Sequence, residues 1–106
     1  MTTVEYIQEH EFKSFLSQNN LVVVDFTATW CGPCKMVSPL MDKLAEEFKD
    51  RAKVVKLDLD QNQSVAKSLG IRSIPTVIFF KNGEPLEKIV GVVAYEKFSA
   101  ALTNIL

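Results

Sequence analysis

A nearly continuous apolar run at residues 21–26, with the sequence LVVVDF, most constrains how this chain folds. The run is rich in valine, and β-branched side chains favour an extended backbone. A strand with one face in water alternates apolar and polar residues, whereas a strand covered on both faces shows little alternation. The sequence therefore predicts a central strand here, in a sheet that has other elements packed on both sides.

Strand-like and helix-like patterns alternate along the rest of the chain. Further strands are predicted at residues 4–7, 54–59 and 76–80, and after the turn at Asn82-Gly83. Apolar residues at helical spacing indicate helices near residues 12–16, 33–48, 65–69 and 95–105. Because Asn-Gly favours a tight hairpin, the last two strands are expected to be antiparallel neighbours. The order βαβαβαββα predicts an α/β fold, with a mixed sheet of five strands flanked by four helices.

Size and charge narrow the class of protein. The 106 residues suffice for one domain and are few for two, so residues 1–106 are expected to form a single domain. The 12 Lys and Arg residues against 13 Asp and Glu leave no positive surplus for a nucleic-acid backbone, and nucleic acid is not an expected partner. Apolar runs are far shorter than the roughly 20 residues of a membrane helix, so no membrane association is expected. Residues 1–5 lack the features of a secretory signal, and a cytoplasmic location is the expectation.

The chain has 2 cysteines, Cys31 and Cys34, close together in sequence. A structural disulfide stabilises a fold mainly by closing a long loop, and this pair would close a very short one. The cysteines are therefore expected to take part in a reaction instead of stabilising the fold. Without a third cysteine a disulfide-linked dimer is not expected, and we predict a monomer.

The pair lies where the predicted central strand passes into the long helix, which places Cys31 at the helix N-terminus. Unpaired N–H groups and the helix dipole favour a negative charge there, and so favour the thiolate that attacks disulfides. Lys35 adds positive charge nearby. Pro33 suits the first helical turn, and Gly32 places no side chain between the sulfurs, so a reversible disulfide is expected.

The same spacing also occurs as half of a zinc site, which needs four ligands. Besides the two cysteines the chain offers 1 histidine, His10, so a complete metal site would need a second chain or a less usual ligand. The sequence contains no Gly-rich phosphate loop either. No bound cofactor is predicted, and the redox-active group is expected to be the cysteine pair itself.

The motif Trp30-Cys31-Gly32-Pro33-Cys34-Lys35 resembles the active-site motif of the thioredoxin family. The similarity covers nearly the whole chain, and includes Val24-Asp25-Phe26, Lys56, Ile74-Pro75-Thr76, Asn82-Gly83 and Gly91. The resemblance implies the thioredoxin fold and a general protein-disulfide reductase, acting on disulfide-containing client proteins. It further implies recycling by an NADPH-dependent thioredoxin reductase, a flavoenzyme. Gly32 and Pro33 would tune the redox potential toward the reducing end.

By the same resemblance, Cys31 is the exposed nucleophile that forms a mixed disulfide with the client, and Cys34 is the buried thiol that resolves it. Asp25 would exchange the proton of Cys34, since burial raises the pKa of a carboxyl toward the range of a general base. Lys56 on the neighbouring strand would partner Asp25 and moderate that shift. The residues alone leave two simpler readings open, an Asp25 that faces water at a sheet end and a Lys56 with an ordinary solvated ammonium.

The resemblance also implies a cis peptide bond between Ile74 and Pro75, although only about 5–6% of X–Pro bonds in folded proteins are cis. Beside the cysteines, such a bond would leave the Ile74 backbone free to pair with an extended client segment. Trp30, Gly32, Ile74 and Gly91 would form a shallow apolar docking surface with Pro75. Trp30 could equally be a partly buried packing residue.

Two other functions remain open at this point. The first is an oxidant or isomerase of higher potential on the same fold, because local features around the thiolate decide the potential. The second is a binding subunit of a larger complex, in which the two thiols are incidental.

Overall fold

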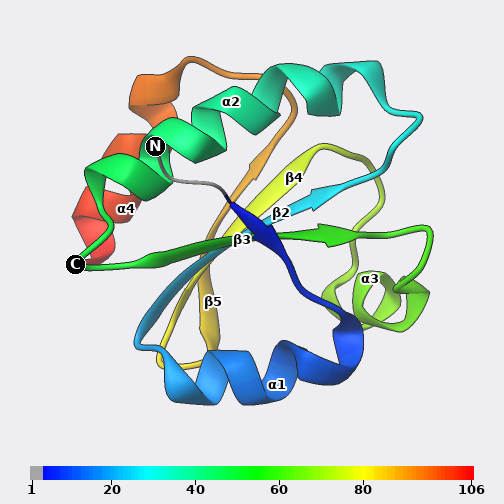
Figure 1. Cartoon of the computed structure of the whole chain (residues 1–106), viewed down its shortest axis with the longest axis horizontal. Helices are drawn as coiled ribbons and strands as arrows, with labels where there is room; N and C mark the ends of the chain where they lie inside the picture. The colour runs from blue at the N-terminus through cyan, green and yellow to red at the C-terminus, as the bar shows by residue number, and fades with distance from the viewer. Residues whose placement is uncertain (1–3) are drawn as a thin grey trace.

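The computed structural model describes residues 4–106, and its strands and helices follow the predicted order βαβαβαββα (Figure 1). Residues 1–3 lie outside the described residues. They belong to the predicted domain and to the N-terminal segment that lacks the features of a secretory signal. The strands are β1 (Glu5–Tyr6), β2 (Leu21–Thr27), β3 (Lys53–Asp58), β4 (Thr76–Lys81) and β5 (Glu84–Val90). The helices are α1 (Glu9–Gln18), α2 (Gly32–Glu47), α3 (Gln63–Leu69) and α4 (Tyr95–Ile105). The predicted α/β fold is confirmed.

β2 lies at the centre of a sheet of 5 strands in the order β1-β3-β2-β4-β5. It pairs in parallel with β3 and antiparallel with β4, so the sheet is mixed, as predicted. All 7 residues of β2 are buried, which explains why its sequence does not alternate between apolar and polar residues.

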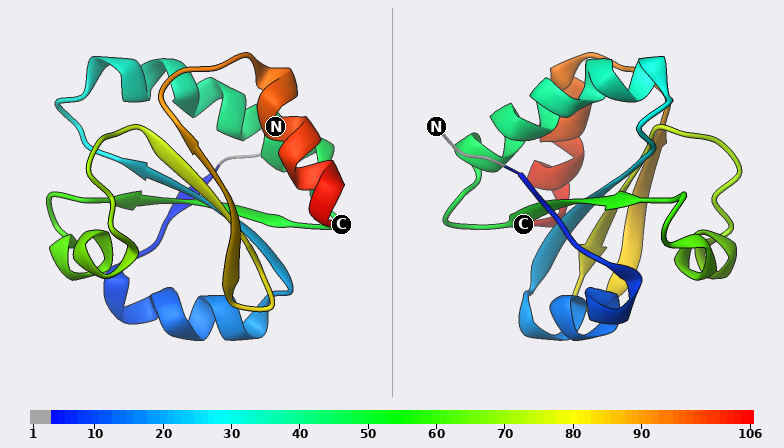
Figure 2. Two further views of the ribbon diagram at one scale, coloured as in Figure 1. Left: turned by 180° about the vertical axis from the view of Figure 1, so that it is seen from behind. Right: turned by 45° about the vertical axis from the view of Figure 1, so that its right-hand side comes forward.

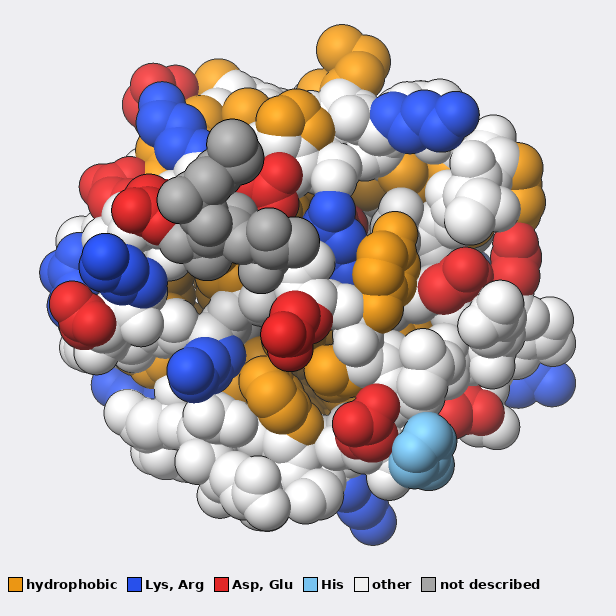
Figure 3. All heavy atoms as spheres, viewed as in Figure 1, with side chains coloured by type: hydrophobic (Ala, Val, Ile, Leu, Met, Phe, Trp, Pro, Cys, Tyr) orange, Lys and Arg blue, Asp and Glu red, His pale blue; other side chains and the backbone are white. Residues whose placement is uncertain are grey.

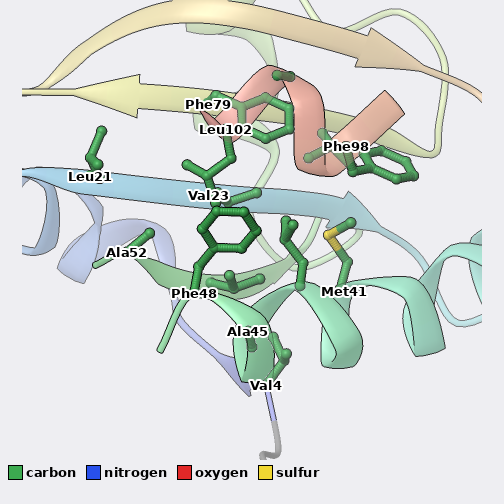
Figure 4. Close-up of a cluster of buried hydrophobic side chains, with 14 of the residues drawn as sticks. Val4, Leu21, Val23, Met41, Ala45, Phe48, Ala52, Phe79, Phe98 and Leu102 are labelled. Atoms are coloured by element: carbon green, nitrogen blue, oxygen red, sulfur yellow. The ribbon is translucent and has the colours of Figure 1, made fainter. Parts of the chain in front are cut away.

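Helices cover both faces of the sheet. Figures 1 and 2 show α2 and α4 on one face and α1 and α3 on the other. Alternate side chains of β2 enter two separate apolar clusters. Val23 belongs to the cluster under α2 and α4, with Met41 and Phe98 (Figure 4), and Val24 belongs to the opposite cluster, with Phe12. One buried strand thus supplies the core on both sides.

The predicted hairpin joins β4 to β5 through Asn82-Gly83. Both residues have left-handed backbone angles, with φ of 53° and 84°, the conformation that Asn-Gly accommodates in a two-residue turn. β5 is an edge strand and is mostly exposed. Pro85 lies where the pairing with β4 shifts register. Because proline lacks an N–H donor, it is tolerated at such an edge.

The outer surface carries charges of both signs. Lys, Arg, Asp and Glu side chains are interspersed over the face of the molecule shown in Figure 3. Among residues 4–106, none of the helices has the length and hydropathy needed to cross a bilayer.

Asn62 ties the start of α1 to the loop between β3 and α3, and it is only 1% exposed. Its side-chain amide donates to the backbone carbonyl of Asp58 at 2.7 Å and to Oε1 of Gln8 at 3.1 Å. Its Oδ1 accepts from the backbone N–H of Glu9 at 2.7 Å. The buried amide therefore has partners for its donors and for its acceptor.

We expect Asn62→Ala to lower the free energy of unfolding by about 2 kcal/mol, because it leaves buried donors and acceptors unpaired. Urea unfolding followed by circular dichroism measures the loss. Asn104→Ala, at an exposed position on α4, is the matched control and should stay within about 0.5 kcal/mol of wild type. Equal losses in the two variants would contradict the structural role of Asn62.

Candidate functional site

The chain passes from the carboxyl end of β2 into α2 (Figure 1). Cys31 immediately precedes α2 and Cys34 lies in its first turn. Cys31 is the N-cap of α2 and Pro33 lies in its first turn, as the sequence predicted. Cys31 and Cys34 are joined by a disulfide, with their Cα atoms 5.3 Å apart. The backbone N–H of Cys34 donates to Sγ of Cys31 at 3.2 Å. A hydrogen-bond donor is thus directed at the sulfur nearest the helix terminus.

Both cysteine side chains are covered. Cys31 is 4% exposed and Cys34 is 2% exposed, so the expectation of an exposed Cys31 is wrong for this disulfide form. Cys31 is bonded to Cys34 in the first turn of α2, and Ala28 and Ile74 pack against the pair. In the same segment it is Trp30 that lies open to solvent, with 69% of its surface exposed.

A hydrogen bond fixes the exposed ring of Trp30. Its indole Nε1–H donates to Oδ2 of Asp60 at 2.7 Å, across a sequence separation of 30 residues. Asp60 lies in the loop between β3 and α3. Sequence reasoning did not identify Asp60 as part of this site, because a turn residue is a common feature and its partner is distant in sequence.

The loop before β4 reaches the same edge of the sheet. The Ile74–Pro75 peptide bond is cis, the isomer that the sequence resemblance implies. The carbonyl of Pro75 accepts from the backbone N–H of Gly91 at 2.8 Å. Gly91 has a φ of 90°, which favours glycine. Since Ile74 packs against the cysteine pair, these contacts gather Ile74, Pro75 and Gly91 beside it.

Asp25 is buried in the sheet beneath α2. It is 1% exposed, and neither carboxyl oxygen has a hydrogen-bond partner. Asp25 follows Val23 by two residues, so its side chain is on the face covered by α2 and α4. Burial raises the pKa of Asp25 to about 7, and the nearby positive charge of Lys56 opposes that rise. The reading in which Asp25 faces water is therefore wrong.

Lys56 is the direct neighbour of Asp25 on β3, since the two are Cα partners in the parallel pairing. Its ammonium, however, donates to the hydroxyl of Ser38 on α2. It also lies 5.9 Å from the centroid of the Tyr6 ring. Lys56 thus acts on Asp25 by charge and forms its hydrogen bond elsewhere. Ser38 was missed by sequence reasoning, because a single helical serine carries no signal of its own.

The sequence model of the thioredoxin family matches residues 3–104. This chain belongs to the thioredoxin family. It is 44% identical over 103 residues to the thioredoxin of Pyropia yezoensis, which covers 96% of each chain. It is 46% identical over 89 residues to the bifunctional thioredoxin reductase/thioredoxin of Mycobacterium leprae, covering 84% of this chain and 19% of that one. The solved structure of Malassezia sympodialis thioredoxin has a TM-score of 0.87 and 38% identity, covering 98% of this chain and 94% of that chain.

Thioredoxins are dithiol–disulfide oxidoreductases, and this chain holds the cysteine pair of the family in its disulfide form. The protein is therefore a thioredoxin-type protein-disulfide reductase whose redox-active group is the Cys31–Cys34 disulfide. Within residues 4–106, no group of three or more His, Cys, Asp or Glu side chains is placed to hold a metal ion. The cysteines are instead bonded to each other.

The raised pKa of Asp25 makes stability depend on pH. The ordinary pKa is 3.8 and the folded pKa is about 7, so the unfolded chain releases this proton at lower pH than the folded protein does. The contribution of Asp25 to stability is therefore greatest below about pH 4, and it falls by about 4 kcal/mol as the pH rises through 7. Asp25→Asn removes the charge, so its stability relative to wild type should be about 4 kcal/mol higher at pH 8 than at pH 4.

Urea unfolding of the two proteins across this pH range checks the prediction. Asp50→Asn, at an exposed position, is the matched control and should follow the wild-type curve. A stability difference between Asp25→Asn and wild type that stays constant with pH would sink this interpretation of Asp25.

Proposed function

We propose that Cys31 attacks disulfides of client proteins and that Cys34 resolves the mixed disulfide. The observation that carries the proposal is the disulfide across the first turn of α2, with the N–H of Cys34 directed at the Cys31 sulfur. After reduction, this N–H and the helix terminus stabilise a thiolate on Cys31. Cys34 lies on the buried side of α2, where a thiol keeps its proton until it is needed.

The exchange proceeds in two balanced steps. The Cys31 thiolate bonds to one sulfur of the client disulfide, and the other client sulfur leaves as a thiolate. Cys34 then loses its proton and attacks the Cys31 sulfur, which closes the Cys31–Cys34 disulfide and releases the second client thiolate. Two electrons pass from the cysteine pair to the client. Gly32 and Pro33 keep the two sulfurs one turn apart, and so tune the potential of this couple.

Asp25 is the proposed acceptor of the Cys34 proton. The buried side of α2, which includes Cys34, packs over the sheet face to which Asp25 belongs. Because the pKa of Asp25 is about 7, both its protonated and ionised forms are populated near neutral pH. Such a group can accept a proton and return it in the next cycle. Lys56 modulates Asp25 by lowering the pKa that burial alone would give.

Trp30, Ile74, Pro75 and Gly91 are the proposed docking surface for clients, together with Gly32. Ile74 packs against the cysteine pair, and Trp30 is largely exposed next to it in sequence. A Cβ atom at Gly32 or Gly91 would meet no atom within 4 Å, so these positions leave space for a client backbone. An extended client segment would pair with the main chain at Ile74 by strand addition.

The proposed electron donor is an NADPH-dependent thioredoxin reductase, a flavoenzyme. Members of the family act with thioredoxin reductase, and the Mycobacterium leprae relative carries both functions in one protein. We further propose that residues 1–106 act as a single domain and a monomer in the cytoplasm. A reducing compartment suits a cysteine pair that must be returned to the dithiol after every cycle.

Cys34→Ser should trap a mixed disulfide with a client, because the attacking thiol remains and the resolving thiol is gone. Cys31→Ser should trap almost none, since Cys34 lies on the buried side of α2 and lacks the N-cap position that stabilises a thiolate on Cys31. Non-reducing electrophoresis and mass spectrometry after incubation with a disulfide-containing protein measure the adducts, and the double serine variant gives the blank. Comparable trapping through Cys34 would reverse the proposed order of attack.

Trp30→Ala should raise KM for a protein client roughly tenfold, which corresponds to the loss of about 1–2 kcal/mol of docking energy. Reduction of a small aromatic disulfide, which does not need the docking surface, should change less than about twofold. The matched control is Leu86→Ala, which truncates a 50% exposed side chain on β5. An equal loss with both substrates would assign Trp30 to the chemistry or to the fold instead of to docking.

A further inference from the structure

Ser38 links the helix that carries the cysteines to the strand beside Asp25. It lies on α2 one turn after Cys34, and its hydroxyl accepts a hydrogen bond from the ammonium of Lys56 on β3. Both side chains are half-buried. A hydrogen bond to an ionised group that is partly removed from water is stronger than one between neutral groups. The contact is therefore strong enough to set where the ammonium lies.

The strand pairing places that ammonium close to Asp25. Lys56 and Asp25 are Cα partners on neighbouring strands. Two residues before them lie Val54 and Val23, both in the cluster under α2 and α4, so the two polar side chains share that face. A lysine ammonium sits on a long flexible stem, and its position is set by what it binds.

We propose that Ser38 is a positioning residue of this redox site. Ser38 holds the Lys56 ammonium near the buried Asp25 carboxyl, so that the ammonium acts on Asp25 by its charge without forming a hydrogen bond to it. An effect of Ser38 on catalysis would depend on the proposed role of Asp25 as proton acceptor, and only that part of the proposal rests on the proposed function. The geometry that Ser38 imposes on Lys56 is open to direct test.

If Ser38 no longer binds the Lys56 ammonium, the other charged groups near Ser38 determine its new position. Lys35 and Asp42 flank Ser38 on α2, by three and four residues respectively, and Asp42 is half-buried. Without the serine hydroxyl, the ammonium moves to water or toward the half-buried Asp42, because Asp25 is only 1% exposed and the ammonium would lose most of its hydration to reach that carboxyl. Both movements take positive charge away from Asp25.

Lys56 is the charge that acts on the pKa of Asp25. Asp58, two residues after Lys56 on β3, lies on the same face of the sheet, and its carboxylate accepts a hydrogen bond from the backbone of the loop that follows β3. On β4 the Cα partner of Asp25 is Val77, which is apolar, and on β1 the partner of Lys56 is Tyr6. Cys34 titrates only in the reduced form. The measurement is therefore made on the disulfide form, in which the cysteines do not titrate.

Titration of the Asp25 carboxyl carbon by NMR gives its pKa directly. Ser38→Ala should raise this pKa by roughly half a unit, the scale expected when one charge moves a few ångströms at an effective dielectric of about 20. Ser38→Thr restores a hydroxyl and should restore the wild-type value. The matched control is Ser99→Ala, which removes an α4 hydroxyl bonded to the Glu96 carbonyl and should cause no shift.

A double-mutant cycle shows whether the effect passes through Lys56. Lys56→Met should raise the pKa of Asp25 by itself, and adding Ser38→Ala should then change nothing further. The proposal is overturned if Ser38→Ala leaves the pKa unchanged, lowers it, or raises it equally in the Lys56→Met background. A separate result would contradict the proposed catalytic role of Asp25: the Asp25→Asn variant would resolve mixed disulfides at the wild-type rate.

Discussion

Burial of β2 on both faces is the constraint on which the rest of the structure depends. The strand supplies apolar side chains to the clusters under both helical layers, and its central place in the sheet follows from that. The same burial encloses Asp25, whose carboxyl oxygens have no hydrogen-bond partner. An ionised carboxyl is more stable in water than in a buried site. Burial of Asp25 in the strand therefore lowers the free energy of unfolding at neutral pH. Such a conflict with stability is typical of functional sites.

The position of the strand also determines where the cysteines lie. β2 ends at the edge where the chain enters α2, and the start of β4 and the end of β5 reach the same edge because both run antiparallel to their neighbours in the sheet. Cys31, Ile74, Pro75 and Gly91 therefore meet although they are far apart in sequence. The site is built from the ends of elements whose interiors form the core. Its geometry is fixed by the packing of the whole sheet.

Local signals in the sequence were enough to predict the fold. The apolar run of β2, the Asn82-Gly83 turn and the helical stripe after Pro33 each depend on neighbouring residues, and each lies where it was expected. The cysteine pair was also predicted, because its chemistry requires close spacing. The burial of Cys31, the bond from Trp30 to Asp60 and the hydroxyl partner of Lys56 were not predicted. These features depend on side-chain directions and on contacts between separate elements, which become defined only after packing.

The disulfide spans a sequence separation of 3 residues, so forming it removes little freedom from the unfolded chain. Reduction and unfolding together form a closed thermodynamic cycle. The difference in redox potential between the folded protein and its unfolded chain, multiplied by the charge of the two electrons transferred, therefore equals the difference in unfolding free energy between the reduced and oxidised forms. The N–H of Cys34, which favours a thiolate on Cys31, contributes equally to both differences. The redox potential of the folded protein relative to that of its unfolded chain therefore reports how the stability of the reduced form compares with that of the disulfide form.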